Sequence, residues 1–245
     1  MPLTQLHDSG GVLAITKPAG LPTQAPSGIT SVESLVREQL FGAAAAAALA
    51  AGRRRHPGGF LGLPHRLDRA VSGVLLLATT PRAARQLARQ FERRQIRKTY
   101  LAIVAPVDLP APAAGTAFEW HDTIRKVPDE PRAEIVPAGT PDGREATTHG
   151  RVRAAGDGGT LLLELEPVTG RMHQLRVQAA ARGLPVVGDF LYGGRPAGPP
   201  PADERAAAIA LHAWRIGFLD PLTGAETVVT CPPPTSPPWP AGTAA

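Results

Sequence analysis

Cysteine is nearly absent from this chain, because Cys231 is the single one among 245 residues. One cysteine excludes an internal disulfide framework and any zinc site built from several cysteines. No apolar run approaches the roughly 20 residues that a membrane-spanning helix needs. The N-terminus also lacks a basic segment followed by an apolar core. We therefore expect a cytoplasmic protein with no membrane association.

Lysine is also scarce, since only Lys17, Lys98 and Lys126 stand among the 26 basic residues. The positive charge is thus almost entirely arginine, and the formal net charge is +5. The planar guanidinium group suits phosphate oxygens and stacks on bases, so the composition indicates a nucleic-acid partner. Genome composition is an alternative explanation of the bias towards alanine, arginine, proline and glycine. It accounts for the totals but not for the clusters of arginine.

A glycine-rich phosphate loop is missing, and the seven histidines stand singly. Neither a nucleotide-dependent nor a metal-dependent enzyme therefore has support, and we expect no metal and no cofactor. The length suits one large domain or two small ones, with a sizeable core.

The densest motif runs from His65 to Gly73 and leads into the apolar segment 74–78. This segment is short and rich in valine and leucine, which predicts a buried strand with Asp68 in the turn before it. The flanking Arg66 and Arg69 should keep the carboxylate ionised, because nearby positive charge favours the charged form. An ionised carboxylate beside a basic surface suits covalent chemistry on a polyanion. An aspartate in such a turn also serves as a plain turn former.

Other elements follow from periodicity and from boundary residues. Ser31 predicts the start of a helix that continues through Leu40. Residues 42–59 are low in sequence complexity, and we interpret them as a segment that leaves the core and runs over the surface. The three consecutive arginines Arg53–Arg55 within it either face solvent or contact RNA. Strand patterns cover residues 11–17, 98–104, 145–152, 160–167 and 208–219, with weaker ones near 116–120 and 133–137.

A second predicted helix begins at Pro81, with Thr80 as its cap, and continues through Arg94. Its arginines fall on one face, opposite alanine, leucine and phenylalanine side chains that would pack on a sheet. The arginine face is either solvated surface or a stripe that follows an RNA backbone, and the charges at residues 94–98 favour RNA. The arginines are Arg82, Arg85, Arg89 and Arg93.

A second dense motif runs from Thr169 to Gln178, where a helix is predicted after Gly170, from Arg171 to Arg182. Arg171, His173 and Arg176 would lie near its start, where backbone N–H groups favour anions. His173 has no second ligand at metal spacing, so a structural hydrogen bond is its expected role. Tyr100, in the strand 98–104, is either a core residue or a stacking platform.

In these motifs the sequence resembles the RluA family of RNA pseudouridine synthases. The resemblance rests on five ordered blocks and a weaker sixth at residues 211–213, and it covers most of residues 11–220. One block alone would carry little weight, whereas five in the right order are specific. The blocks are Lys17–Gly20, His65–Asp68 with Ser72–Gly73, Lys98–Ala102, Thr169–Val177, and Gly188–Asp189 with Tyr192–Gly193.

The resemblance implies an isomerase that breaks the N-glycosidic bond of a uridine in structured RNA and rejoins the base through C5, without a cofactor. It implies Asp68 as the catalytic carboxylate, Tyr100 as the ring that stacks on the flipped base, and Arg176 as the partner of Asp68. Arg66 would enter the space that the base leaves. Removing the base from its stack costs about a few kcal/mol, which an aromatic ring and an inserted arginine offset. Further RNA contacts are expected from Arg69, Arg171 and His173.

The implied fold is α+β, the pseudouridine synthase fold: a long mixed, mostly antiparallel sheet with flanking helices and a central RNA-binding cleft. We expect one catalytic domain over residues 1–231 without an S4 RNA-binding domain, then a proline-rich, disordered tail over 232–245. The expected substrate is ribosomal or transfer RNA, and the expected state is a monomer. The alternative is a non-catalytic RNA-binding or RNA-chaperone protein of the same fold, against which the intact Asp68, Tyr100 and Arg176 argue.

Two positions depart from the family pattern. Val71 stands where threonine is common, which removes a hydroxyl group near Asp68. Gln178 stands where histidine is common. Neither position has an implied catalytic role, but the first changes the hydrogen bonding available near the carboxylate.

Overall fold

The computed structural model describes residues 2–52, 58–107, 110–196, 207–236 and 238–239. The chain divides into two compact units, of which the first comprises residues 1–96 and 215–232 and the second residues 97–214 and 233–245. Strand β9 (Leu211–Leu219) has residues in both units. The arginine run 53–55 lies outside the described residues, so its role stays a prediction.

The first unit is built on strands that pair antiparallel in the order β1, β2, β3. Strand β3 is buried along its whole length, as its run of valine and leucine predicts. A further strand, β10, pairs antiparallel with the part of β9 that belongs to this unit. The bounds are β1 (Gln5–Ser9), β2 (Val12–Lys17), β3 (Ser72–Ala78) and β10 (Glu226–Thr230).

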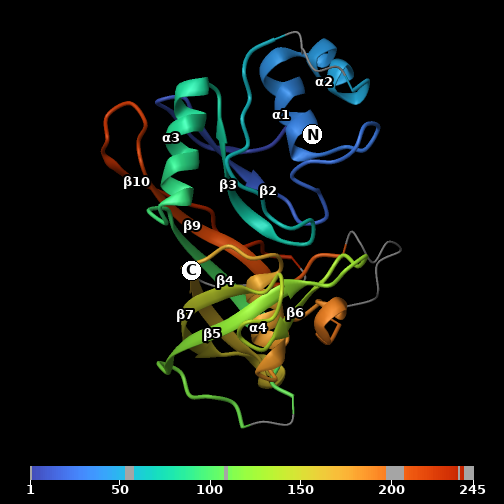
Figure 1. Cartoon of the computed structure of the whole chain (residues 1–245), viewed down its shortest axis with the longest axis vertical. Helices are drawn as coiled ribbons and strands as arrows, with labels where there is room; N and C mark the ends of the chain where they lie inside the picture. The colour runs from blue at the N-terminus through green and yellow to red at the C-terminus, as the bar shows by residue number, and fades with distance from the viewer. Residues whose placement is uncertain (1, 53–57, 108–109, 197–206, 237, 240–245) are drawn as a thin grey trace. The chain divides into compact units, whose positions relative to one another are not determined.

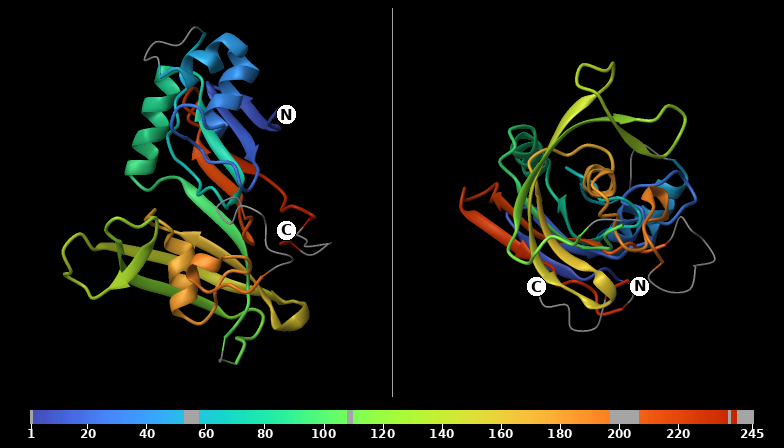
Figure 2. Two further views of the ribbon diagram at one scale, coloured as in Figure 1. Left: turned by 90° about the vertical axis from the view of Figure 1, so that its right-hand side faces the viewer. Right: turned by 90° about the horizontal axis from the view of Figure 1, so that it is seen from below.

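Helices α1 (Val32–Phe41), α2 (Ala43–Ala50) and α3 (Pro81–Glu92) belong to the same unit (Figure 1). The predicted caps are confirmed: Ser31 forms a reciprocal capping box at α1, and Thr80 accepts the N–H of Ala83 at α3. Helices α1 and α2 pack on each other, whereas α3 packs on β3 (Figure 2). Helix α2 lies within residues 42–59, the segment interpreted from the sequence as running over the surface, and its alanines favour a helix.

The second unit contains strands that are neighbours in the order β4, β8, β7, β5, β6, and each neighbouring pair is antiparallel. Helix α4 (Gln174–Ala181) packs against β5 and β6, as the orange helix beside the yellow-green strands of Figure 2 shows. Both weak strand patterns are confirmed, the first as the longer strand β5 and the second as the short strand β6. The bounds are β4 (Arg97–Val104), β5 (Ala117–Lys126), β6 (Ala133–Val136), β7 (Arg144–Ala155) and β8 (Leu161–Pro167).

The predicted α+β class with mostly antiparallel strands is thus confirmed, while the central cleft stays a prediction. Among the described residues, no helix has the length and apolar character needed to cross a membrane. Near the C-terminus, Trp239 is 3% exposed, and its ring lies edge-on to His212 with centroids 5.9 Å apart. The predicted domain boundary at residue 231 and the disorder of the tail stay predictions.

Candidate active site

Asp68 lies half-buried in the turn that precedes β3, between the exposed side chains of Arg66 and Arg69. The backbone N–H of Val71 closes this turn by donating to the carbonyl of Asp68 at 3.1 Å. The buried strand β3 follows at once and fixes one end of the turn. The predicted local structure is therefore observed, and the catalytic role of Asp68 stays a prediction.

A buried cation holds the backbone of this turn. Lys17 is fully buried, and its Nζ donates to the carbonyls of Pro18 (3.0 Å), Arg69 (3.2 Å) and Val71 (2.7 Å). Burial lowers the pKa of Lys17 to about 7, while the negative charge of Asp68 acts in the opposite direction. Sequence reasoning missed this role, although Lys17 opens the first block of the resemblance.

The loop that follows Lys17 also binds the turn. Thr23 Oγ1 donates to the carbonyl of Leu67 at 2.9 Å and accepts its N–H at 3.2 Å. The N–H of Gly20 donates to the carbonyl of Arg69 at 2.7 Å, and Arg69 Nε donates back to the carbonyl of Gly20 at 2.8 Å. Gly20 has a φ of 83°, in the region that favours glycine. The first two blocks of the resemblance, Lys17–Gly20 and His65–Asp68, are therefore in contact through the turn of Asp68 and the loop that follows Lys17.

His65, the first residue of the motif that contains Asp68, contacts both β3 and α3. Its Nε2 accepts the backbone N–H of Leu76 at 2.9 Å, so the neutral ring carries its proton on Nδ1. The ring stacks on Phe91 of α3, with centroids 4.8 Å apart and an angle of 26° between the planes. The segment that carries Asp68 is thus fixed at both ends.

In the second unit, Arg176 lies in the first turn of α4 and is 7% exposed. It forms a bidentate pair with the buried Asp189, in which Nε donates to Oδ2 at 2.6 Å and Nη2 donates to Oδ1 at 2.8 Å. Its Cζ lies 5.1 Å from the ring centroid of Tyr192, within the range of a cation–π contact. Sequence reasoning missed both partners, although they stand in the fifth block of the resemblance.

The start of α4 corrects the sequence prediction. The helix begins at Gln174 and not directly after Gly170, so Arg171 and His173 lie in the turn before it. His173 adopts a left-handed backbone with a φ of 52°, which interrupts a helix. The side-chain oxygen of Gln174 accepts the hydroxyl of Thr169 at 2.7 Å and the N–H of Arg171 at 3.0 Å, and these bonds stabilise the turn.

The expected structural hydrogen bond of His173 is observed. Its Nδ1 lies 2.9 Å from the hydroxyl of Tyr192. That hydroxyl accepts the N–H of Ala133 at 2.8 Å and donates to the carbonyl of Ala133 at 3.2 Å. Because the hydroxyl has a single proton, the Nδ1 of His173 is the donor in this arrangement. An RNA contact of His173 or Arg171 stays a prediction.

Tyr100 lies half-buried on β4, opposite Leu165 of β8. Lys98 stands two residues earlier and therefore on the same face of the strand. Its Nζ donates to the carbonyl of Thr169 at 3.3 Å, and burial lowers the pKa of Lys98. The strand that carries Tyr100 and the turn that leads to α4 are thus joined within the second unit.

The departure at Gln178 has a packing explanation. The side chain is fully buried, and both ends of its amide are satisfied. Oε1 accepts the hydroxyl of Thr148 at 2.7 Å, and Nε2 donates to Asp122 at 2.7 Å. The neutral amide thus accepts the hydroxyl of Thr148 and donates to the carboxylate of Asp122, without placing a charge in the core.

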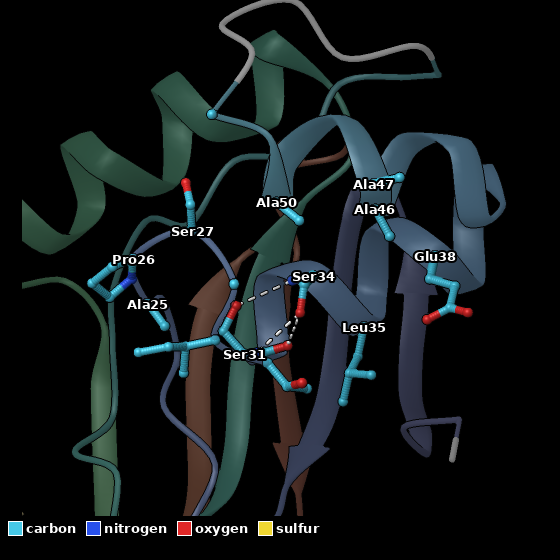
Figure 3. A pocket seen from close by; sticks show the side chains of 14 residues that line it. Ala25, Pro26, Ser27, Ser31, Ser34, Leu35, Glu38, Ala46, Ala47 and Ala50 are labelled. Carbon is cyan, nitrogen blue, oxygen red and sulfur yellow. Dashed lines mark hydrogen bonds between the residues drawn. The ribbon is translucent and has the colours of Figure 1, made fainter.

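A separate hollow of about 590 Å³ lies in the first unit, between the loop 25–31 and helices α1 and α2 (Figure 3). Its lining is mostly small or apolar, and Glu38 is its titratable side chain. The predicted site residues are not part of this lining. Elsewhere in the described chain, no group of three or more histidine, cysteine, aspartate or glutamate side chains is placed to hold a metal ion.

Comparisons with known proteins agree with these motifs. A family model described as RNA pseudouridylate synthase matches residues 11–181. The ribosomal large subunit pseudouridine synthase D of Xanthomonas campestris is 34% identical over 241 residues, which cover 96% of this chain and 67% of that protein. The dual-specificity RNA pseudouridine synthase RluA of Yersinia pestis is 30% identical, with 92% of this chain and 97% of that protein covered.

A solved structure agrees as well. The human RNA pseudouridylate synthase domain-containing protein 1 has a TM-score of 0.66 and 26% identity, over 96% of this chain and 85% of that one. The family model spans the positions of Asp68, Tyr100 and Arg176. Motifs, fold and comparisons thus lead to one conclusion: the chain belongs to the RluA-type RNA pseudouridine synthases, isomerases that convert uridine in RNA to pseudouridine.

Proposed function

We propose that this isomerase acts on uridines of structured ribosomal or transfer RNA, with Asp68 as the catalytic carboxylate. In the reaction the C1′–N1 bond breaks, the C1′–C5 bond forms, C5 loses a proton and N1 gains one. Positive charge develops on the ribose as the base departs, and a carboxylate is well placed to stabilise it. The observation that supports this role is the half-buried turn of Asp68, which Lys17 fixes and exposed arginines flank.

Tyr100 and Arg176 complete the proposed catalytic set. Tyr100 would stack on the flipped uracil, and Arg176 would pair with Asp68 and keep it ionised, because an unpaired carboxylate in a partly dry pocket takes up a proton. A guanidinium group has five N–H donors, and its bond to Asp189 engages Nε and Nη2. A guanidinium group with this number of donors can bind two carboxylates at once.

The RNA contacts are proposed from both units. Arg66 would fill the space that the base leaves, while the remaining cations contact the RNA around the target. The name of the Xanthomonas relative refers to the large ribosomal subunit, and that of the Yersinia relative to a dual specificity, which supports structured RNA as substrate. We also propose a cytoplasmic monomer without metal or cofactor, with its catalytic domain in residues 1–231. The remaining proposed RNA-binding residues are Arg69, Arg171 and His173.

Asp68→Ala tests the catalytic assignment on total RNA from a strain that lacks the gene. We expect pseudouridine formation to be lost while RNA affinity stays within a few-fold of wild type. Asp8→Ala removes an exposed carboxylate from β1 of the same unit and should keep full activity. If Asp68→Ala still forms pseudouridine, Asp68 is not the catalytic carboxylate.

The proposed substrate is tested by mapping pseudouridines in ribosomal and transfer RNA from strains with and without the gene. Identical maps from the two strains would refute the proposed substrate.

A further inference from the structure

Helix α3 presents a row of exposed arginines on its outer face, while Ala83, Leu87 and Gln90 of the opposite face are buried. Successive arginines are three or four residues apart, so they stand on adjacent turns of the helix. At about 1.5 Å per residue, the row rises roughly 16 Å from first to last. We name this set the α3 row; its members are Arg82, Arg85, Arg89 and Arg93.

The α3 row has no acidic partner within the described part of the chain, whereas several other arginines do. In the second unit, for example, Arg125, Arg132 and Arg151 each form an ion pair with a glutamate. No ion pair or side-chain hydrogen bond joins the row to another described residue. Like charges on adjacent turns repel each other, so the row favours a polyanionic partner that neutralises it.

The row is also tied to the turn of Asp68. Phe91 lies between the last two arginines in the sequence and stacks on His65, which stands three residues before Asp68. Helix α3 lies beside β3, the strand that follows the turn (Figure 1). The C-terminal end of the row and the proposed catalytic turn are therefore held by one aromatic contact within the first unit.

We propose that the α3 row binds the phosphate backbone of the RNA that flanks the target uridine. This inference rests on the proposed function, because it takes RNA as the substrate, and it adds a binding surface outside the proposed catalytic set. The guanidinium fork matches phosphate oxygens, and backbone contacts position a nucleic acid without reading its sequence. The row should therefore supply affinity that depends on salt and not on the sequence of the flanking strand.

The triple variant Arg82→Gln/Arg85→Gln/Arg89→Gln tests the proposal and leaves Arg93 in place beside the contact with His65. The Kd for substrate RNA is measured between about 50 and about 200 mM salt. The loss of three phosphate contacts should lower the magnitude of the slope of log Kd against log salt by about 2, at about 0.7 per contact for a single strand. The matching Arg→Lys variant keeps the charge and should keep most of the slope.

The control Arg125→Gln/Arg132→Gln/Arg151→Gln removes the same charge from ion-paired positions and should leave the slope nearly unchanged. An unchanged slope in the α3 variant, or an equal decrease in both variants, overturns the inference. Unfolding curves of all variants verify that they fold. Pseudouridine formation is measured in the same samples: an active wild type with an unchanged variant slope refutes the α3 row alone, whereas an inactive wild type refutes the proposed function.

Discussion

In each unit, a buried cation beside the proposed chemistry is fixed by oxygen atoms of the protein. Lys17 binds carbonyl groups of Arg69 and Val71, which stand 52 and 54 positions further along the chain. Arg176 binds Asp189, 13 positions away. Both charges are thus held in place by the protein's own oxygen atoms, and fixed charges of this kind need little reorganisation during a reaction.

The pair of Arg176 and Asp189 should matter strongly for stability. Asp189→Asn is expected to lower the free energy of unfolding by about 3 to 5 kcal/mol, because it removes the charged partner from a buried, bidentate ion pair. Denaturant unfolding monitored by tryptophan fluorescence measures the change. Glu134→Gln, which breaks a partly exposed pair with Arg125, is the control and should have a much smaller effect. Equal losses in the two variants would contradict the argument.

Lys17 should make stability depend on pH in the neutral to alkaline range. Its pKa is about 7 in the folded protein against an ordinary value of 10.5, so between these values the unfolded chain holds a proton that the folded protein has lost. The free energy of unfolding should therefore rise with pH across this window, by at most about 1.4 kcal/mol per pH unit from this residue. Below the window the cost of the buried charge is fully present.

Denaturant unfolding at several pH values between about 7 and about 9 measures this rise. Lys17→Met replaces the titratable side chain with a neutral, unbranched one. The free energy of unfolding of this variant should therefore rise less steeply with pH than that of the wild type. An identical pH dependence in Lys17→Met and wild type would show that the ammonium group does not titrate in this range. Lys126→Met, at the exposed last residue of β5, is the control.

At the scale of elements, the sequence predicted what local patterns determine. Strand β3 was predictable because its residues are apolar and buried without interruption, and α3 because Thr80 and Pro81 mark its start. Strands β1 and β10 escaped prediction, since their residues are mostly polar and exposed and they are held by pairing with β2 and β9. Such pairing depends on residues far apart in the chain.

The start of α4 shows the same limit at the candidate site. The predicted helix starts directly after Gly170, whereas the observed helix starts only at Gln174, because side-chain hydrogen bonds of Gln174 and the left-handed backbone of His173 hold the preceding residues in a turn. The turn of Asp68 was predictable from its neighbours. Its dependence on Lys17 was not, because the contacts form only when β2 and β3 pair.

At the scale of the whole molecule, the C-terminal segment tests how far the catalytic domain extends. The sequence predicts a disordered tail over residues 232–245, and its deletion would then have no effect on stability. The burial of Trp239 against His212 leads us to expect a loss of about 3 kcal/mol, as for other buried tryptophans. Denaturant unfolding of the deletion variant and of Trp239→Ala measures it, and unchanged transitions would support the disordered tail.

Neither unit is a continuous piece of polypeptide, and this affects how the protein is made. Gln90 of α3 donates to the carbonyl of Leu219 and accepts its N–H, both at 2.8 Å, across 129 positions. At a translation rate of about 5 to 20 residues per second, Leu219 leaves the ribosome roughly ten seconds after Gln90. During that interval the nascent helix has no partner for its buried amide. The first unit is therefore completed only after residues 97–214 have been synthesised, and until then part of its apolar surface stays exposed.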